Sequence, residues 1–323
     1  MKRIFFYMSF LLLCLSVYAQ DPQFSQFYSN PLYLAPSFAG SSEASRIAAN
    51  YRNQWFHLPA KFITYSFSYD HYFSGYNSGV GLFIMKDVAG SGELGIMNAG
   101  IQYSYNFKIF NTWYVRPGLH FYYIEHGLAF DKLTFIDQLM HTSADGTVFP
   151  SNWDPVRDVD LATSLLIYTK KFWMGTNVDH LLKPNISLYA DKHRIPMRVS
   201  LFGGLEIRRK GRLLNPIDET MTLAYMFRTQ GTNMQLDLGV YWHRNPLVLG
   251  LWYRGIPPLN SQRGDAFILL VGYKTPYFNI GYSYDVTISN LISHAIGSHE
   301  VSMSFKFLLP RRTKLGAIPC PEF

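Results

Sequence analysis

The sequence is built from long segments in which apolar and polar side chains alternate. From Phe278 to Thr287, one set of alternate positions reads Phe, Ile, Tyr, Tyr, Val, and the other reads Asn, Gly, Ser, Asp, Thr. The segment from Glu300 to Phe307 alternates in the same way. Because successive side chains of a β-strand point to opposite faces, each segment has one apolar and one polar side. The pattern therefore predicts an all-β chain.

The length of these segments separates two all-β architectures. Strands of a soluble sandwich average about five or six residues. The alternating segments here run for about ten, which is the length that a tilted strand needs to cross a bilayer. Many carry aromatic residues near their ends, as an interfacial girdle would. We therefore predict an all-β fold, a transmembrane antiparallel outer-membrane β-barrel of about 14 strands, with a polar lumen.

The count of segments and the lengths of their connections support this prediction. Fourteen candidate strands lie near residues 44–53, 62–72, 79–87, 95–107, 112–126, 158–168, 171–180, 196–207, 219–227, 233–243, 246–254, 264–274, 277–288 and 298–307. Bacterial barrels have an even number of strands, short periplasmic turns and longer outer loops. Most even-numbered connections are short and several odd-numbered ones are long, with the stretch from Arg208 to Asp218 as an exception.

Composition excludes other classes of protein. Only 16% of the residues are charged, whereas soluble domains average about a quarter. A helical membrane protein would need about 20 consecutive apolar residues in each span, and the only long apolar run lies at the N-terminus. The net charge of +7 is too diffuse to predict nucleic-acid binding.

The N-terminus has the form of a secretory signal peptide. Lys2 and Arg3 precede a short apolar core, and Ala19 provides the small residue before a cut ahead of Gln20. The alternative is an uncleaved anchor. Cleavage would lower the net charge to +5 (27 basic minus 22 acidic residues) and leave one cysteine, Cys320, which cannot form an internal disulfide.

The chain accordingly divides into four parts. We predict a signal peptide over 1–19, a periplasmic N-terminal segment over 20–43, the outer-membrane barrel over 44–307 and a basic periplasmic C-terminal tail over 308–323. The prediction places the protein in the outer membrane of a Gram-negative cell, in contact with the lipid bilayer.

The segment that precedes the first strand has two interpretations. Its Pro and Gln content permits a disordered exit segment. Against this, six large side chains would be costly to leave in water, namely Phe24, Phe27, Tyr28, Leu32, Tyr33 and Phe38. Since exposed apolar clusters usually mark contact sites, we favour a segment packed in the barrel mouth or against a partner.

The basic tail also has two interpretations. A charged end is usually solvated. Alternatively, Arg311 and Arg312 offer forked donors to the carboxylates of a periplasmic partner, and Cys320 could pair with another protein or stay free.

No motif in the sequence indicates an enzyme. Gly90 to Gly95 has the spacing of a dinucleotide-binding loop, but a strand follows where the motif needs a helix. Ser298, His299 and Glu300 are consecutive, so on a strand they cannot converge as a triad. The ten histidines show no metal-binding spacing. We predict no catalytic residues, no cofactor and no metal site.

The predicted lumen needs filling, because a barrel of this width leaves space inside. Asp237, Asp285, Arg254 and Lys306 could line a solute path, although pairing with one another is the simpler expectation. The long connection from Gly127 to Arg157 is the best candidate for a loop that folds inward.

Several long motifs resemble one known family. They are Asp21–Leu32, Ala35–Gly40, Asn50–Trp55, Thr64–Asp70, Leu249–Pro257, Ile280–Ser289, His299–Ser302 and Cys320–Phe323. In this order they are similar to the motifs of the PorP/SprF family, outer-membrane proteins of the type IX secretion system of Bacteroidota. The resemblance covers essentially all of the mature chain.

The resemblance implies a role in export across the outer membrane and in gliding motility. It implies partners of two kinds: the periplasmic lipoprotein ring formed by PorK- and PorN-like components together with the translocon, and a cargo adhesin with a type B C-terminal sorting domain. It does not separate the PorP-like from the SprF-like branch. The competing hypothesis is a passive outer-membrane solute channel or transporter, which single-channel conductance would distinguish.

Overall fold

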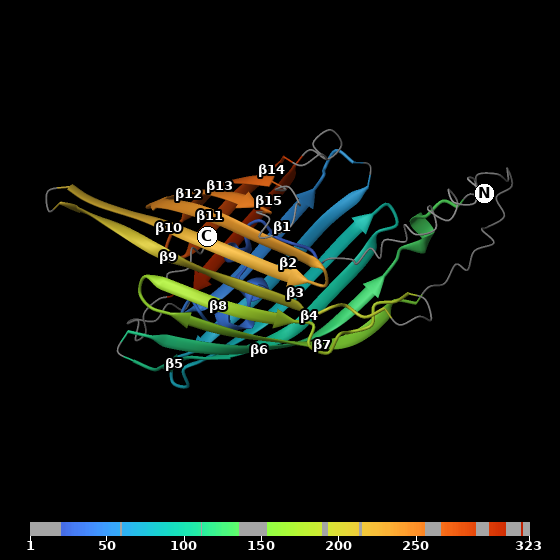
Figure 1. Ribbon diagram of the computed structural model, residues 1–323, viewed down its shortest axis with the longest axis horizontal. Coiled ribbons are helices and arrows are strands. Elements are labelled where there is room, and N and C mark those ends of the chain that lie inside the picture. The colour runs from blue at the N-terminus through green and yellow to red at the C-terminus, as the bar shows by residue number, and fades with distance from the viewer. Residues whose placement is uncertain are drawn as a thin grey trace, which may run out of the picture.

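The computed structural model describes residues 21–58, 60–110, 112–135, 154–188, 193–212, 215–255, 266–288, 297–307 and residue 318. Its strands form one antiparallel sheet (Figure 1). They are β1 (Ser45–Gln54), β2 (Lys61–Phe73), β3 (Ser78–Gly90), β4 (Leu94–Tyr105), β5 (Phe107–Lys108), β6 (Tyr114–Gly127), β7 (Val156–Tyr168), β8 (Phe172–Asp179), β9 (Arg198–Arg212), β10 (Asn215–Gln230), β11 (Asn233–Arg244), β12 (Leu247–Arg254), β13 (Ala266–Lys274), β14 (Phe278–Thr287) and β15 (Ser298–Phe307).

The sheet closes on itself. Each strand pairs with its neighbours in sequence, and β1 pairs with β15 in a register that runs from Ser45 opposite Phe307 to Gln54 opposite Ser298. Strand β5 continues β4 beyond Asn106, and both pair with β6, so the barrel wall has 14 strands. The predicted antiparallel barrel of 14 strands is confirmed, and each predicted strand has its counterpart.

The eighth connection differs from the prediction of a long loop. Strands β9 and β10 continue as far as Arg212 and Asn215, and a register shift lies between Asn215 and Asp218. Figure 1 shows this hairpin extending well past the neighbouring strands. Apolar alternation stops near Arg208 because the strands have left the apolar zone there, while the hydrogen-bonded ladder continues. Loss of alternation was therefore a poor marker of the strand end.

The outer face of the wall is apolar. Large exposed side chains at alternate positions include Leu82, Ile84, Phe121, Leu223, Leu269 and Phe305. In water such a surface would be unfavourable, whereas hydrocarbon chains match it. Among the described residues, no helix is long and apolar enough to cross a membrane.

The two ends of the barrel differ in their connections. The even-numbered connections are all short, and we call their end the turn end. The opposite end, called the loop end, carries the long connections that follow β6, β8, β12 and β14, together with the short turns after β3 and β10. The rule for bacterial barrels predicts that the turn end faces the periplasm.

Residues 21–44 lie inside the barrel, and we call them the plug segment. The plug segment contains three short helical turns, η1 (Phe27–Ser29), α2 (Pro31–Leu34) and η2 (Pro36–Phe38). Pro31 and Pro36 open the last two, where the missing N–H costs nothing. The chain runs from Asp21, beside residues of the loop end, to Ser45 at the turn end. Most of the Gly127–Arg157 connection, our inward-folding candidate, lies outside the described residues.

Candidate functional site in the plugged lumen

One side of the plug segment is apolar and packs against the wall from β6 to β13. The ring centroid of Phe27 lies 4.9 Å from that of Trp252, and the Phe38 centroid lies 5.7 Å from that of Phe202. Tyr28 lies edge-on to Trp173 and donates its hydroxyl to the Gly203 carbonyl oxygen at 3.2 Å. These contacts form one continuous buried cluster with the wall.

This arc of the lumen departs from the polar interior that the sequence analysis predicted. Its inward side chains are apolar and buried, and include Leu166, Trp173, Phe202, Met226, Trp252, Ile268 and Leu270. The plug segment supplies the apolar surface that they need. A signal was present in the sequence, because the run from Phe267 to Val271 is apolar at every position and so has two apolar faces.

The opposite side of the plug segment is held by directional bonds. The Glu300 carboxylate of β15 accepts hydrogen bonds from two backbone amides, Ser25 N at 2.6 Å and Gln26 N at 2.9 Å. The Gln26 side chain donates to Ser283 Oγ at 3.0 Å and accepts from Ser302 Oγ at 2.6 Å. Two strands of the wall therefore recognise both the main chain and a side chain of the plug segment.

Two arginines and two carboxylates surround Ser25. Arg52 forms ion pairs with Asp285 at 2.8 Å and with Glu300 at 3.1 Å. Arg254 pairs with Asp285 at 3.0 Å and donates to Ser25 Oγ at 2.7 Å, and Arg52 contacts the same oxygen. The charges balance, as buried charges must. Of the lumenal residues named from the sequence, Arg254 thus pairs with Asp285, while Asp237 pairs with Arg228 at 2.7 Å.

The C-terminal part of the plug segment is fixed near the turn end. Asp70 accepts from Gly40 N at 2.7 Å and pairs with Arg46 at 2.8 Å. Gly40 has φ +68°, which favours glycine. Arg116 donates to the Ala39 carbonyl oxygen. On the wall, a Cβ at Gly118 would collide with the backbone of the plug segment at Ser37, so glycine permits this close approach.

The N-terminal end of the plug segment is tied down at the loop end. The Asp21 carboxylate accepts from His180 Nε2 at 2.8 Å and Arg198 Nη1 at 3.0 Å, and His180 Nδ1 bonds Asp160 at 2.7 Å. Burial by itself would lower the pKa of His180, but the two carboxylates outweigh it and raise the pKa to about 10. Burial would raise the pKa of Asp21, yet His180 and Arg198 hold it well below its usual range.

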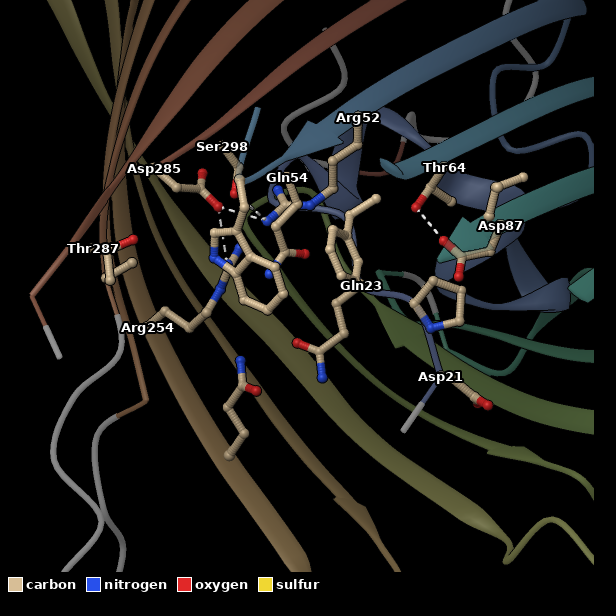
Figure 2. Close-up of a pocket in the computed structure, with 16 residues that line it drawn as sticks. Asp21, Gln23, Arg52, Gln54, Thr64, Asp87, Arg254, Asp285, Thr287 and Ser298 are labelled. Atoms are coloured by element: carbon tan, nitrogen blue, oxygen red, sulfur yellow. Dashed lines mark hydrogen bonds and ion pairs between the residues drawn. The ribbon is translucent and has the colours of Figure 1, made fainter. Parts of the chain in front are cut away.

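A cavity of about 490 Å³ remains between the plug segment and the loop end. Figure 2 shows Arg52, Arg254 and Asp285 on one side of it and Thr64 and Asp87 on the other. The first residues of the plug segment, Asp21 to Gln23, also line it. The cavity therefore has polar groups on both sides and ends at the plug segment.

The structure brings six of the predicted partner-binding residues together. Phe24, Phe27, Tyr28, Leu32 and Phe38 are at most 2% exposed, and Tyr33 is half-buried. Their surfaces are covered by the barrel and by one another. Arg311, Arg312 and Cys320 lie outside the described residues. Among the described residues, no cluster of three or more His, Cys, Asp or Glu could hold a metal ion.

Sequence reasoning missed the wall residues that hold the plug segment. Arg52, Asp70, Arg116, His180 and Glu300 are its main polar contacts. A signal was available for some of them, because Arg52 and Glu300 occupy the polar positions of alternating strands. Charged side chains at membrane depth are expected to have partners. Nothing in the sequence identified which partners.

Comparison with known sequences identifies the chain. The family described as the type IX secretion system membrane protein PorP/SprF matches residues 16–305. The chain belongs to the PorP/SprF family. The resemblance found in the motifs is thereby confirmed, and this family member is an outer-membrane component of type IX secretion. No curated protein matches the sequence.

Solved structures with a similar fold are outer-membrane barrels. The Pseudomonas putida toluene transporter TodX matches with a TM-score of 0.50 and 9% identity over 91% of this chain and 100% of that one. The outer membrane protein Omp33 of Acinetobacter baumannii has a TM-score of 0.44 and 9% identity over 82% and 98% of the two chains. A Pseudomonas aeruginosa FadL homologue has a TM-score of 0.45 and 11% identity over 86% and 94%. At these identities the similarity concerns the fold alone.

Proposed function

We propose that this PorP/SprF member is a closed, non-enzymatic barrel that serves type IX secretion and gliding by binding polypeptide partners. The observation that carries the proposal is the filling of the lumen by residues of the chain itself. Phe24, Phe27 and Tyr28 are at most 1% exposed, and wall residues from both halves of the barrel hold them. A closed barrel suits a binding component better than a passive solute channel or transporter.

The ends of the barrel suggest where the partners bind. The turn end faces the periplasm by the connection rule, and so does the C-terminal end of β15 at Phe307. The PorK- and PorN-like lipoprotein ring is therefore proposed to contact the turn end and the tail, with Arg311, Arg312 and Cys320 as candidate contacts. The translocon and a cargo adhesin with a type B sorting domain are proposed to bind at the loop end.

The place of the plug segment changes the role proposed for its aromatic residues. The sequence analysis assigned Phe24, Phe27, Tyr28, Leu32, Tyr33 and Phe38 to partner binding. In the structure they contact the barrel, so we propose that they close the lumen and that partners bind surfaces other than these six side chains. A partner that bound them directly would first have to displace the plug segment.

Conductance and co-purification together test this proposal. In planar bilayers the wild-type protein should pass little current, and a variant lacking residues 21–40 should pass a large current while still inserting. From native membranes, tagged wild-type protein should retain secretion-system subunits or an adhesin. A large open current through the wild type, without co-purifying secretion subunits, would favour the solute channel.

A further inference from the structure

The cavity at the loop end is the part of the lumen that the plug segment leaves open. Its volume of about 490 Å³ can hold a few amino-acid residues. Eight strands contribute to its walls, and Asp21, Pro22 and Gln23 form its floor. Figure 2 shows the labelled polar side chains arranged around this space. The cavity therefore lies at the loop end, which faces away from the periplasm by the connection rule.

Among the described residues that line the cavity, every charged side chain but one forms an ion pair. Asp285 and Glu300 balance Arg52 and Arg254, and Asp21 pairs with His180 and Arg198.

Asp87 accepts a hydrogen bond from Thr64 Oγ1 at 2.6 Å, and it forms no ion pair among the described residues. A carboxylate in a partly desolvated site without a counter-ion attracts a cation. The cavity therefore favours a cationic group and disfavours a polyanion such as a lipopolysaccharide.

The other lining groups suit a polypeptide that carries this cation. Trp55 and Phe62 form an edge-on pair, with ring centroids 5.0 Å apart. Aromatic faces attract ammonium and guanidinium groups. The amide side chains of Gln23 and Gln54 line the same space and can both donate to and accept from a peptide main chain.

We propose that this cavity binds a lysine- or arginine-bearing segment of a polypeptide that enters from the loop end. The ammonium or guanidinium group pairs with Asp87, and the amide side chains bond the main chain beside it. This inference rests on the proposed binding function and names the chemistry of the partner at this end. It assigns the periplasmic ring no role in the cavity.

Peptide titration of the full-length mature protein in detergent tests the proposal. The probe is acetyl-Gln-Lys-Gln-amide, and acetyl-Gln-Gln-Gln-amide is its neutral match. Calorimetry measures the affinity of each peptide at low and at high ionic strength. The lysine peptide should bind saturably, more weakly at high salt, and Asp87→Asn should weaken binding at least about tenfold. Asp87→Glu keeps the charge and should retain binding. Retained binding in Asp87→Glu would show that Asp87→Asn loses binding through loss of its charge and not through misfolding.

A carboxylate at the same end provides the matched control. Glu93 pairs with Lys61 at 2.6 Å and Lys132 at 2.7 Å and does not line the cavity. Glu93→Gln should leave the peptide affinity unchanged. Equal binding of the neutral peptide, or unchanged affinity in Asp87→Asn, would overturn the proposal, as would salt-independent binding of a neutral oligosaccharide in place of the peptide.

The outcome is separable from that of the proposed function. If a translocon subunit or an adhesin co-purifies equally with the wild type and with Asp87→Asn, the cavity assignment fails while the binding function stands. If no partner co-purifies and the wild type conducts freely, the binding function itself fails.

Discussion

The two halves of the lumen hold the same plug segment in different ways. The charged half, formed by β1, β2, β14 and β15, makes directional bonds to the segment through Glu300, Arg52 and Asp285. The apolar half, formed by β6 to β13, packs rings against rings around Trp252 and Phe202. Directional bonds fix the register of the segment, whereas burial of apolar area supplies most of the favourable free energy. Substitutions on each side of the plug segment separate these contributions.

Removing the central carboxylate of the charged half should have the largest effect. Glu300→Ala leaves two buried backbone amides without their acceptor and removes one of the two carboxylates that pair with Arg52. Breaking a buried charge pair costs about 3–5 kcal/mol. We expect a marked fall in thermal stability and rapid proteolysis of residues 21–44. Mass spectrometry of the cleavage products measures the proteolysis. Glu300→Gln retains one acceptor, so its thermal stability and proteolysis rate should lie between those of the wild type and Glu300→Ala. Identical behaviour of all three proteins would show that the charged half does not fix the register of the plug segment.

Removing one ring from the apolar half should cost slightly less. Phe27→Ala empties a site that is 1% exposed beside Trp252. Large-to-small changes of this kind cost about 3–5 kcal/mol, toward the lower figure where the neighbours can relax. Because the polar bonds keep the register, we expect lower stability with little proteolysis of the plug segment. Proteolysis as fast as in Glu300→Ala would show that burial, too, fixes the register.

The ion pairs of Asp21 with His180 and Arg198 at the loop end, which we call the latch, should make stability depend on pH. The pKa of His180 is raised to about 10, so the stability it contributes is fully present below about pH 6.5 and is lost as pH rises through 10. The pKa of Asp21 is depressed, so its contribution is present above pH 3.8 and is lost as pH falls toward the folded value.

Thermal unfolding of the wild type and of His180→Gln from pH 5 to pH 11 measures this effect. The wild type should be the more stable below pH 9, and the two curves should converge above about pH 10. A constant difference at all pH values would show that the latch acts through packing and not through charge.

The smallest effect is expected outside the lumen. Glu125 and Arg157 form an exposed pair at 3.0 Å on the outer side of β6 and β7. Exposed pairs contribute little because water and salt screen them. Arg157→Ala should leave both the melting temperature and the proteolysis pattern unchanged, and it serves as the charge-removal control for the lumenal variants.

Much of the wall could be predicted from local sequence because the alternation that marks a strand is visible in consecutive residues. Alternation placed every strand, since the side-chain period of two is a property of consecutive residues. It failed at Arg208 to Asp218, where the β9–β10 hairpin continues beyond the apolar zone. The polar lumen was predicted only in part, because the inner face of β13 is apolar where the plug segment covers it.

The sequence by itself determined that the chain is a 14-stranded outer-membrane barrel of the PorP/SprF family, because strand period, strand number and family motifs are all local features. Only the tertiary structure decided that residues 21–44 fill the lumen. The bonds that hold them join Ser25 to Glu300 and Asp285, and Tyr28 to Gly203, across more than half of the chain. Such pairings depend on closure of the sheet, since closure brings the inner faces of distant strands to one space. No local pattern records which of them will meet.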